Sequence, residues 1–211
     1  MKKTAYDMIL YLVAFAAIQI IVSFGTLLGK PFGLQPDDPI MLVAISATAS
    51  IITLLLFLWR KWTPVGKTYI QSKPWATLIW SGVAAIGVVI PSVWLQEQMP
   101  ALPDTAGDTL QKIISTPGGY FVIALLAPVV EEVVFRGAIL RKLLSGMRSK
   151  WGAICISAIL FALVHANPAQ MPHAFLMGLL MGWLYMRTGS IVPGVVFHWA
   201  NNTVAYLIAV A

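Results

Sequence analysis

Long apolar stretches separated by short polar segments are the feature that most constrains the fold of this chain. Each stretch is close to the roughly 20 residues that a helix needs to cross the hydrocarbon core of a bilayer. Because a spanning helix satisfies its own backbone hydrogen bonds in lipid, we expect an all-α protein, a polytopic transmembrane helix bundle. The pattern predicts about seven spans, at 6–28, 39–59, 75–96, 118–145, 151–167, 170–186 and 190–210.

The composition argues against a water-soluble fold. Of the 211 residues, 59% are hydrophobic and 10% are charged, whereas soluble domains carry about 25% charged residues. We therefore expect one transmembrane domain over residues 1–211, with three N-terminal spans and an outer loop in 1–117 and a core of four spans in 118–211. The first apolar run continues to Leu28, which is too long for the apolar core of a signal peptide, so it predicts a retained first span.

The positive charges predict the orientation of the bundle. With the N-terminus in the cytoplasm, eleven of the fourteen Lys and Arg residues fall in cytoplasmic segments. The outer loops then hold Lys30 and Lys112, and Arg136 lies inside a span. This asymmetry follows the positive-inside rule and accounts for the net charge of +6, so we expect no nucleic-acid partner. The single cysteine, Cys155, lies in an apolar run, which excludes an internal disulfide and a Cys-rich metal site.

Ionisable and strongly polar side chains gather in the later spans. A mid-span acid or base costs on the order of 2.5–3.5 kcal/mol on insertion scales, so such a cluster is a functional-site hypothesis by default. Spans one to three hold nothing stronger than Asp7 and Gln19, with scattered Ser and Thr. The fourth, fifth and last spans hold Glu131, Glu132, Arg136, His165, His198, Asn201 and Asn202.

The fourth span places two acids and one base within six residues. Glu132 and Arg136 are four apart, so they share a helix face and can form an ion pair. Glu131 is turned about 100° away and needs a partner on another helix. Pro128, one turn earlier, predicts a kink just before the acids. The alternative interpretation is an interhelical ion network that only fixes packing.

Two later spans each offer one histidine. Phe161 and His165 share a face of the fifth span, and His198 and Asn202 share a face of the last. Taken alone, each histidine is compatible with a hydrogen-bonding residue in a packed span. His173 follows Pro172 at the start of a span, and we interpret it as a loop or interface residue.

Taken together, these residues predict hydrolytic chemistry. Short loops make the three helices neighbours, so Glu131, His165 and His198 could hold one divalent metal ion such as zinc with an open position for water. Alternatively, Glu131 activates a water without a metal, while a histidine and Asn202 donate hydrogen bonds to the developing oxyanion. Both schemes cleave a peptide or ester carbonyl. The chain has no HExxH and no GxSxG motif, which excludes the zinc and serine sites that depend on them.

The ordered motifs resemble a known family. EExxxR at Glu131–Arg136, FxxxH at Phe161–His165 and HxxxN at His198–Asn202 are similar to the motifs of the CPBP family, the CAAX prenyl endopeptidases and bacteriocin-processing membrane proteases. The resemblance covers roughly residues 118–205. It implies a helical intramembrane endopeptidase whose catalytic residues are Glu131, His165, His198 and Asn202. Glu132, Arg136 and Phe161 would support them.

The resemblance also implies a location and a partner. We expect a bacterial inner-membrane protein with its site open to the cytoplasm, acting on a peptide or lipidated protein. Two other functions stay open on the sequence. One is a non-catalytic immunity or scaffold protein that binds a peptide. The other is a proton-linked transporter, because intramembrane Glu and His also build proton relays, although the chain shows no internal repeat.

Overall fold

The computed structural model describes residues 2–29, 31, 33, 35, 37–64, 66, 75–99 and 101–211. Within these residues all regular structure is helical, which confirms the all-α prediction. The first helices are α1 (Lys2–Ser23), α2 (Thr26–Gly29), α3 (Pro39–Trp59), α5 (Trp75–Gln98) and α6 (Gly107–Ile114). They are followed by η2 (Phe121–Leu126), α7 (Ala127–Glu132), η3 (Val133–Leu140), α8 (Arg141–Gly146), α9 (Lys150–Val164), α10 (Met171–Thr188) and α11 (Val192–Val210).

The first three predicted spans correspond to α1, α3 and α5. Residues Lys3–Ser23, Pro39–Trp59 and Trp75–Leu95 are long and apolar enough to cross a membrane. Large apolar side chains stand exposed along all three helices, such as Ile21 at 68% and Ile90 at 76% exposure. Such surfaces suit contact with lipid tails rather than water. The chain is an integral membrane protein.

The later predicted spans are helical too, but they are shorter, interrupted or more polar. Residues 119–146 form an unbroken helical run in which the π-helices η2 and η3 alternate with α7 and α8. Helix α9 has only 15 residues. The count of seven spans therefore stays a prediction. Helix α6 lies between the third and fourth predicted spans, where the sequence predicted an outer loop. Its burial of Ile113 and Ile114 explains why it forms.

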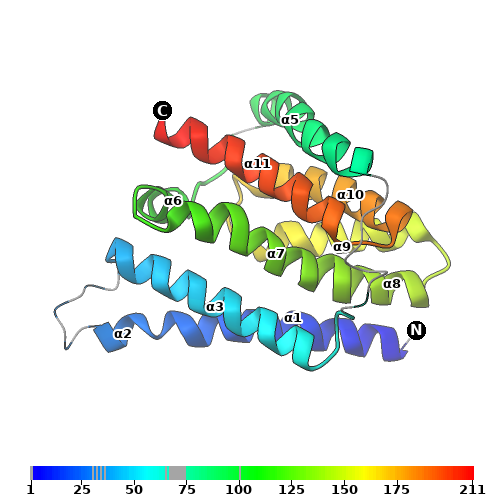
Figure 1. The fold of residues 1–211 in the computed structure, drawn as a ribbon, viewed down its shortest axis with the longest axis horizontal. Coiled ribbons are helices and arrows are strands. Elements are labelled where there is room, and N and C mark those ends of the chain that lie inside the picture. Colours follow the sequence, from blue (N-terminus) through cyan, green and yellow to red (C-terminus); the bar gives the residue numbers. More distant parts are fainter. Residues whose placement is uncertain are drawn as a thin grey trace.

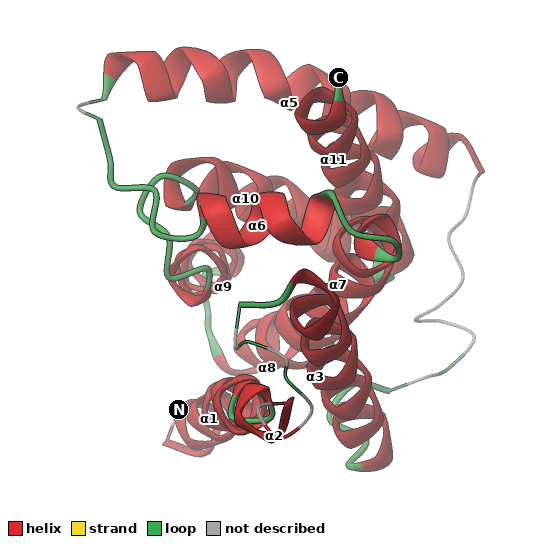
Figure 2. Cartoon of the chain, turned by 90° about the vertical axis from the view of Figure 1, so that its left-hand side faces the viewer, coloured by secondary structure: helices red, strands yellow, loops and turns green. Residues whose placement is uncertain are grey.

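The helical run from η2 to α8 passes through the middle of the molecule. In Figure 1, α1 and α3 lie along the lower edge and α5 along the upper edge, with α7 and α8 between them. Figure 2 shows α5 crossing above α10 and α11, and α11 contacts both α5 and α10. All eight residues of η3 are buried, so this run forms the core against which the other helices pack.

The π-helix η3 depends on hydroxyl groups from distant segments. A π-helix shifts the backbone hydrogen bonds by one residue, and carbonyl groups left over need partners. The Thr63 hydroxyl donates to the carbonyl oxygen of Val133 over 2.6 Å, and the Ser157 hydroxyl donates to that of Phe135 over 3.3 Å. Gly137 leaves the space that the Thr63 side chain occupies. These contacts fix the helix just beyond the two acids.

Small residues bring α9 and α10 together. A Cβ atom at Gly178 of α10 would lie 2.9 Å from the Cα atom of Ala158 in α9, and one at Gly182 would lie 2.9 Å from a methyl carbon of Ile154. The hydrophobic effect does not drive helices together in lipid, so membrane helices depend on close packing, which small residues allow. The close approach also places the carbonyl group of Gly178 within reach of Arg136.

Candidate active site

Glu132 and Arg136 form the predicted ion pair at the centre of the bundle. Arg136 Nη1 lies 2.7 Å from Glu132 Oε1, and both side chains are fully buried. Arg136 also donates from Nη2 to the carbonyl oxygen of Gly178 over 3.3 Å, and its guanidinium carbon lies 4.4 Å from the ring centre of Phe161. The pair therefore links the fourth predicted span to α9 and α10, which is a structural task.

Glu131 has a different environment from its neighbour. Its Oε2 atom lies 3.7 Å from His198 Nε2, which is too long for a direct hydrogen bond. That oxygen is buried and has no hydrogen-bond partner in the described part of the chain. The Glu131 side chain keeps 23% of its surface exposed and lines a cavity of about 200 Å³. It is a carboxylate with free acceptor capacity beside an imidazole and an open space.

His198 lies between the two carboxylates. Its Nε2 atom faces Glu131, and its Nδ1 atom lies 3.9 Å from Glu132 Oε1. Gly194, one turn before His198, lies directly against the Glu132 carboxylate, where a Cβ atom would collide with Oε2. The absence of a side chain at Gly194 therefore lets the start of α11 approach the acids closely. This contact joins the last predicted span to the fourth, as the sequence predicted.

His165 reaches the same cluster from the end of α9. Its Nδ1 atom lies 2.8 Å from the carbonyl oxygen of Phe161. Because a carbonyl oxygen only accepts, Nδ1 is the donor and Nε2 of the neutral ring keeps a free lone pair. The Phe161 ring centre lies 4.9 Å from that of His165 and 5.8 Å from that of His198, edge to face in both cases. Phe161 thus contacts both histidines and Arg136.

Asn202 is oriented by two hydrogen bonds. Its Nδ2 donates to the carbonyl oxygen of Ile123 in η2 over 3.1 Å, and its Oδ1 accepts from Asn201 Nδ2 over 3.3 Å. An amide nitrogen carries two hydrogens, so one donor of Asn202 stays available. Asn202 therefore offers one N–H donor in a fixed position on α11, and an oxyanion site requires such a donor.

His173 belongs to this polar region, and the sequence interpretation missed it. It lies in the first turn of α10, where its Nδ1 atom is 2.8 Å from the hydroxyl oxygen of Ser92 in α5. The Asn201 side chain lies beside its ring, and His165 and His198 are within electrostatic range. Pro172 indicated that His173 lies at the start of a helix, because Pro favours the first turn, but it gave no sign of the partners from other helices.

The side chains do not fit the metal scheme. Among the described residues, no group of three His, Cys, Asp or Glu side chains lies close enough to hold a metal ion. Glu131 approaches His198, with 3.7 Å between Oε2 and Nε2, but among the described residues no third side chain of these types completes a set of ligands.

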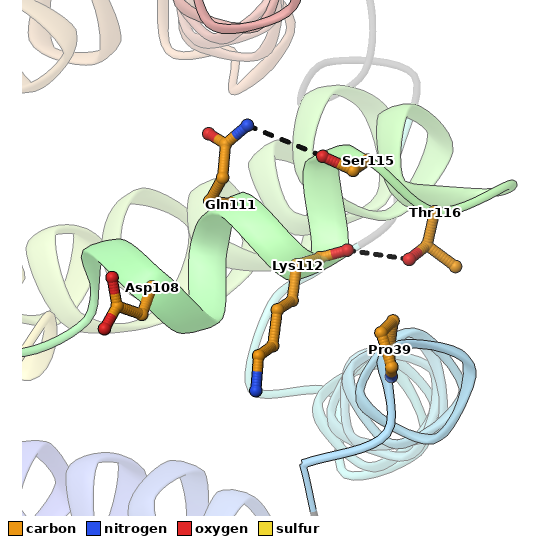
Figure 3. Close-up of a pocket in the computed structure, with 6 residues that line it drawn as sticks. All are labelled: Pro39, Asp108, Gln111, Lys112, Ser115 and Thr116. Carbon is orange, nitrogen blue, oxygen red and sulfur yellow. Dashed lines mark hydrogen bonds between the residues drawn. The ribbon is translucent and has the colours of Figure 1, made fainter.

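A second pocket lies away from these residues. It has a volume of about 490 Å³ and lies between α6 and the start of α3, lined by Pro39, Asp108, Gln111, Lys112, Ser115 and Thr116 (Figure 3). Lys112 forms an ion pair with Asp37, which holds the pKa of that carboxyl group below its usual value. The hydroxyl of Thr116 donates to the backbone of Lys112. This pocket contains none of the predicted site residues.

Comparison with known proteins agrees with the ordered motifs. The model of the Type II CAAX prenyl endopeptidase Rce1-like family matches residues 114–204, a range that contains all three motifs. The chain is also 28% identical over 176 residues to an uncharacterized 24.3 kDa protein of Escherichia coli, covering 76% of this chain and 77% of that one. No solved structure matches the chain. The resemblance is confirmed for residues 114–204, which are similar to the Type II CAAX prenyl endopeptidase Rce1-like family.

Proposed function

We propose that this protein is an intramembrane endopeptidase that hydrolyses a peptide bond in a membrane-associated or hydrophobic peptide or protein. One observation carries the proposal: Glu131 is an intramembrane carboxylate with an unpaired oxygen, next to His198 and open to a cavity. Glu132 differs, because its Oε1 atom is paired with Arg136 and its side chain is fully buried, although its Oε2 atom also lacks a hydrogen bond among the described residues. The family whose model matches residues 114–204 is a family of endopeptidases.

The proposed reaction uses the protein's own side chains. Glu131 takes a proton from a water beside His165 as the water oxygen bonds to the substrate carbonyl carbon. The negative charge that develops on the carbonyl oxygen is stabilised by the free N–H of Asn202 and by His198. The carbon–nitrogen bond then breaks, and Glu131 returns its proton to the leaving amine. The two peptide products are then released, one with a new carboxyl group and the other with a new amine, and together they contain the atoms of the water.

Glu132 and Arg136 support this arrangement without contacting substrate. Their ion pair holds the helix that carries Glu131 against α9 and α10. The Glu132 carboxylate also faces Nδ1 of His198 over 3.9 Å, which is too long for a hydrogen bond but close enough for electrostatic attraction to a positively charged ring. We assign the pair a positioning role.

The distribution of positive charge supports a cytoplasmic site. We propose seven spans with the N-terminus in the cytoplasm of a bacterial inner membrane, and a membrane-associated or lipidated protein as the substrate. The support is the excess of Lys and Arg in the predicted cytoplasmic segments, which follows the positive-inside rule.

The experiment that tests the proposal is cleavage of a hydrophobic peptide library by the purified protein in detergent, read by mass spectrometry. Glu131→Gln keeps the shape of the side chain but cannot take up a proton, so it should lower the rate by about 10²–10⁴-fold. Asp37→Asn is the matched control, because Asp37 is an exposed loop acid paired with Lys112. Equal cleavage by Glu131→Gln and the parent would contradict the proposal.

A further inference from the structure

We infer that the cavity beside Glu131 is a water-filled recess that binds the substrate's peptide backbone next to the scissile bond, through Gln19, Ser46 and Ser50. The inference rests on the proposed function and adds a substrate-binding wall to it. Gln19 lies on α1 and both serines lie on α3, and all three line the cavity with Glu131. The binding groups thus come from segments outside the family match at 114–204.

Among the described residues, the polar side chains of this wall form no hydrogen bonds. A helical Ser or Thr hydroxyl commonly donates to the carbonyl oxygen four residues earlier, as Thr48 and Thr53 of the same helix do, each over 2.7 Å. No such hydrogen bond is formed within the described residues by the Ser46 or Ser50 hydroxyl, or by the Gln19 carboxamide. Being four apart, Ser46 and Ser50 lie on one face of α3, which is the face toward the cavity.

Unpaired polar groups at membrane depth require a polar occupant. Moving a hydroxyl or amide group from water into an apolar environment costs several kcal/mol of free energy if it finds no hydrogen-bond partner. Lipid tails offer no such partner. Two hydroxyls, one carboxamide and one carboxylate around a single cavity therefore exclude an acyl chain as its resident. Water meets this requirement in the free protein.

The size and the other lining residues favour a short stretch of peptide. A volume of about 200 Å³ corresponds to about seven waters at roughly 30 Å³ each, and it is below the 300 Å³ at which pockets for drug-sized ligands begin. A peptide group presents one donor and one acceptor, and Gln and Ser side chains supply both. The rest of the lining is apolar and would accept an apolar side chain; it consists of Phe15, Ile113, Val122, Ile123, Ala127 and Val130.

The cavity also borders the proposed oxyanion site. Ile123 lines it, and the carbonyl oxygen of Ile123 is the acceptor that orients Asn202. A backbone held by α1 and α3 would therefore run between Glu131 and Asn202. The expected substrate is an extended segment with an apolar residue beside the cleaved bond.

The first test measures whether water and peptide enter the cavity, independently of cleavage. Cys155, the only cysteine, is first replaced by serine in a Glu131→Gln protein. A single new cysteine is then introduced by Ser46→Cys, Ser50→Cys or Thr48→Cys, and each variant is reconstituted in proteoliposomes. Thiols react as thiolates, which need water, so a small polar thiol reagent should label the first two variants. Thr48 is the matched control, because it lies outside the cavity and is bonded to Ala44.

A saturating hydrophobic peptide library should slow the labelling of Ser46→Cys and Ser50→Cys at least several-fold. The inference is overturned if Ser46→Cys and Ser50→Cys are labelled no faster than Thr48→Cys. It is also overturned if the peptides leave their labelling rates unchanged. Protection by peptide when the parent protein cleaves nothing would support the recess and contradict the proposed peptidase.

The second test measures kinetics with a cleaved peptide. Gln19→Leu and Ser50→Ala each remove about one hydrogen bond, and a loss of up to roughly 1.5 kcal/mol corresponds to about tenfold in kcat/KM, mainly through KM. Thr48→Ala should leave both constants unchanged. If Gln19→Leu and Ser50→Ala keep the parent's KM and kcat, the binding wall is contradicted while the peptidase stands.

Discussion

At the scale of single residues, two adjacent acids have opposite tasks because their neighbours differ. Glu132 is fully buried and paired with Arg136, whereas Glu131 is partly exposed, faces His198 and lines a cavity. The i, i+4 spacing was sufficient to predict the pair, since that contact lies within one helix. The place of His173 could not be predicted, because its partners Ser92 and Asn201 come from other helices.

Breaking the buried ion pair should destabilise the fold. Glu132→Gln leaves the Arg136 guanidinium buried without its carboxylate, which costs about 3–5 kcal/mol. Glu132→Gln combined with Arg136→Met should recover much of the loss, because a buried pair exchanged for neutral groups is often tolerated. Unfolding in detergent, titrated with a denaturing surfactant, measures both. A Glu132→Gln protein as stable as the parent would show that the pair is not part of the packing.

At the scale of elements, the prediction was right for helices that are continuously apolar. It was incomplete where contacts with distant segments determine the local helix type or whether a helix forms. The ranges 39–59 and 75–96 match α3 and α5 closely. The π-helix η3 could not be predicted, because it is held by the hydroxyls of Thr63 and Ser157 from distant segments. Helix α6 was missed because it is short and follows a segment rich in Pro and Asp.

The contact between α9 and α10 gives a prediction at this scale. Gly178→Ala would press a methyl group against the Ala158 backbone and displace the carbonyl group that Arg136 uses. We expect a loss of about 1–3 kcal/mol, as for other overpacked cores. Gly87→Ala on α5 is the matched control, since nothing lies within 4 Å of its added methyl.

Thermal unfolding of the two alanine variants in detergent measures this difference. Gly87→Ala should be neutral or slightly stabilising, by up to about 1 kcal/mol, because alanine is the better helix residue. Equal melting temperatures for Gly178→Ala and Gly87→Ala would mean that the two helices can separate without cost at this point.

At the scale of the whole molecule, large apolar side chains cover the outside of the long helices, while one ion pair lies buried at the centre. The exposed surface of α1, α3 and α5 is apolar, while Glu132 and Arg136 are fully buried. Composition alone predicted this apolar surface, because a chain with 10% charged residues cannot cover itself for water. Composition could not set which helices cross the bilayer completely, since the polar residues of the site lie in the later helices themselves.

The orientation makes a direct prediction. In a Cys155→Ser protein expressed in intact bacteria, Asp108→Cys should react with a membrane-impermeant thiol reagent, and Arg148→Cys should react only after the cells are opened. The reason is that positively charged turns such as that at Arg148 stay in the cytoplasm. The reverse pattern would place the N-terminus outside and move the site to the opposite side.

The measurement that tests the account most directly is a double-mutant cycle on Glu131 and His198. Rates of peptide cleavage are compared for the parent, Glu131→Gln, His198→Ala and the double variant. Side chains that act as one catalytic unit have strongly non-additive effects, so the account predicts that each single change lowers the rate by at least about 10²-fold and that the double variant is little slower than either. The account would be contradicted if the rate loss of the double variant equalled the product of the two single losses, or if the single variants cleaved like the parent.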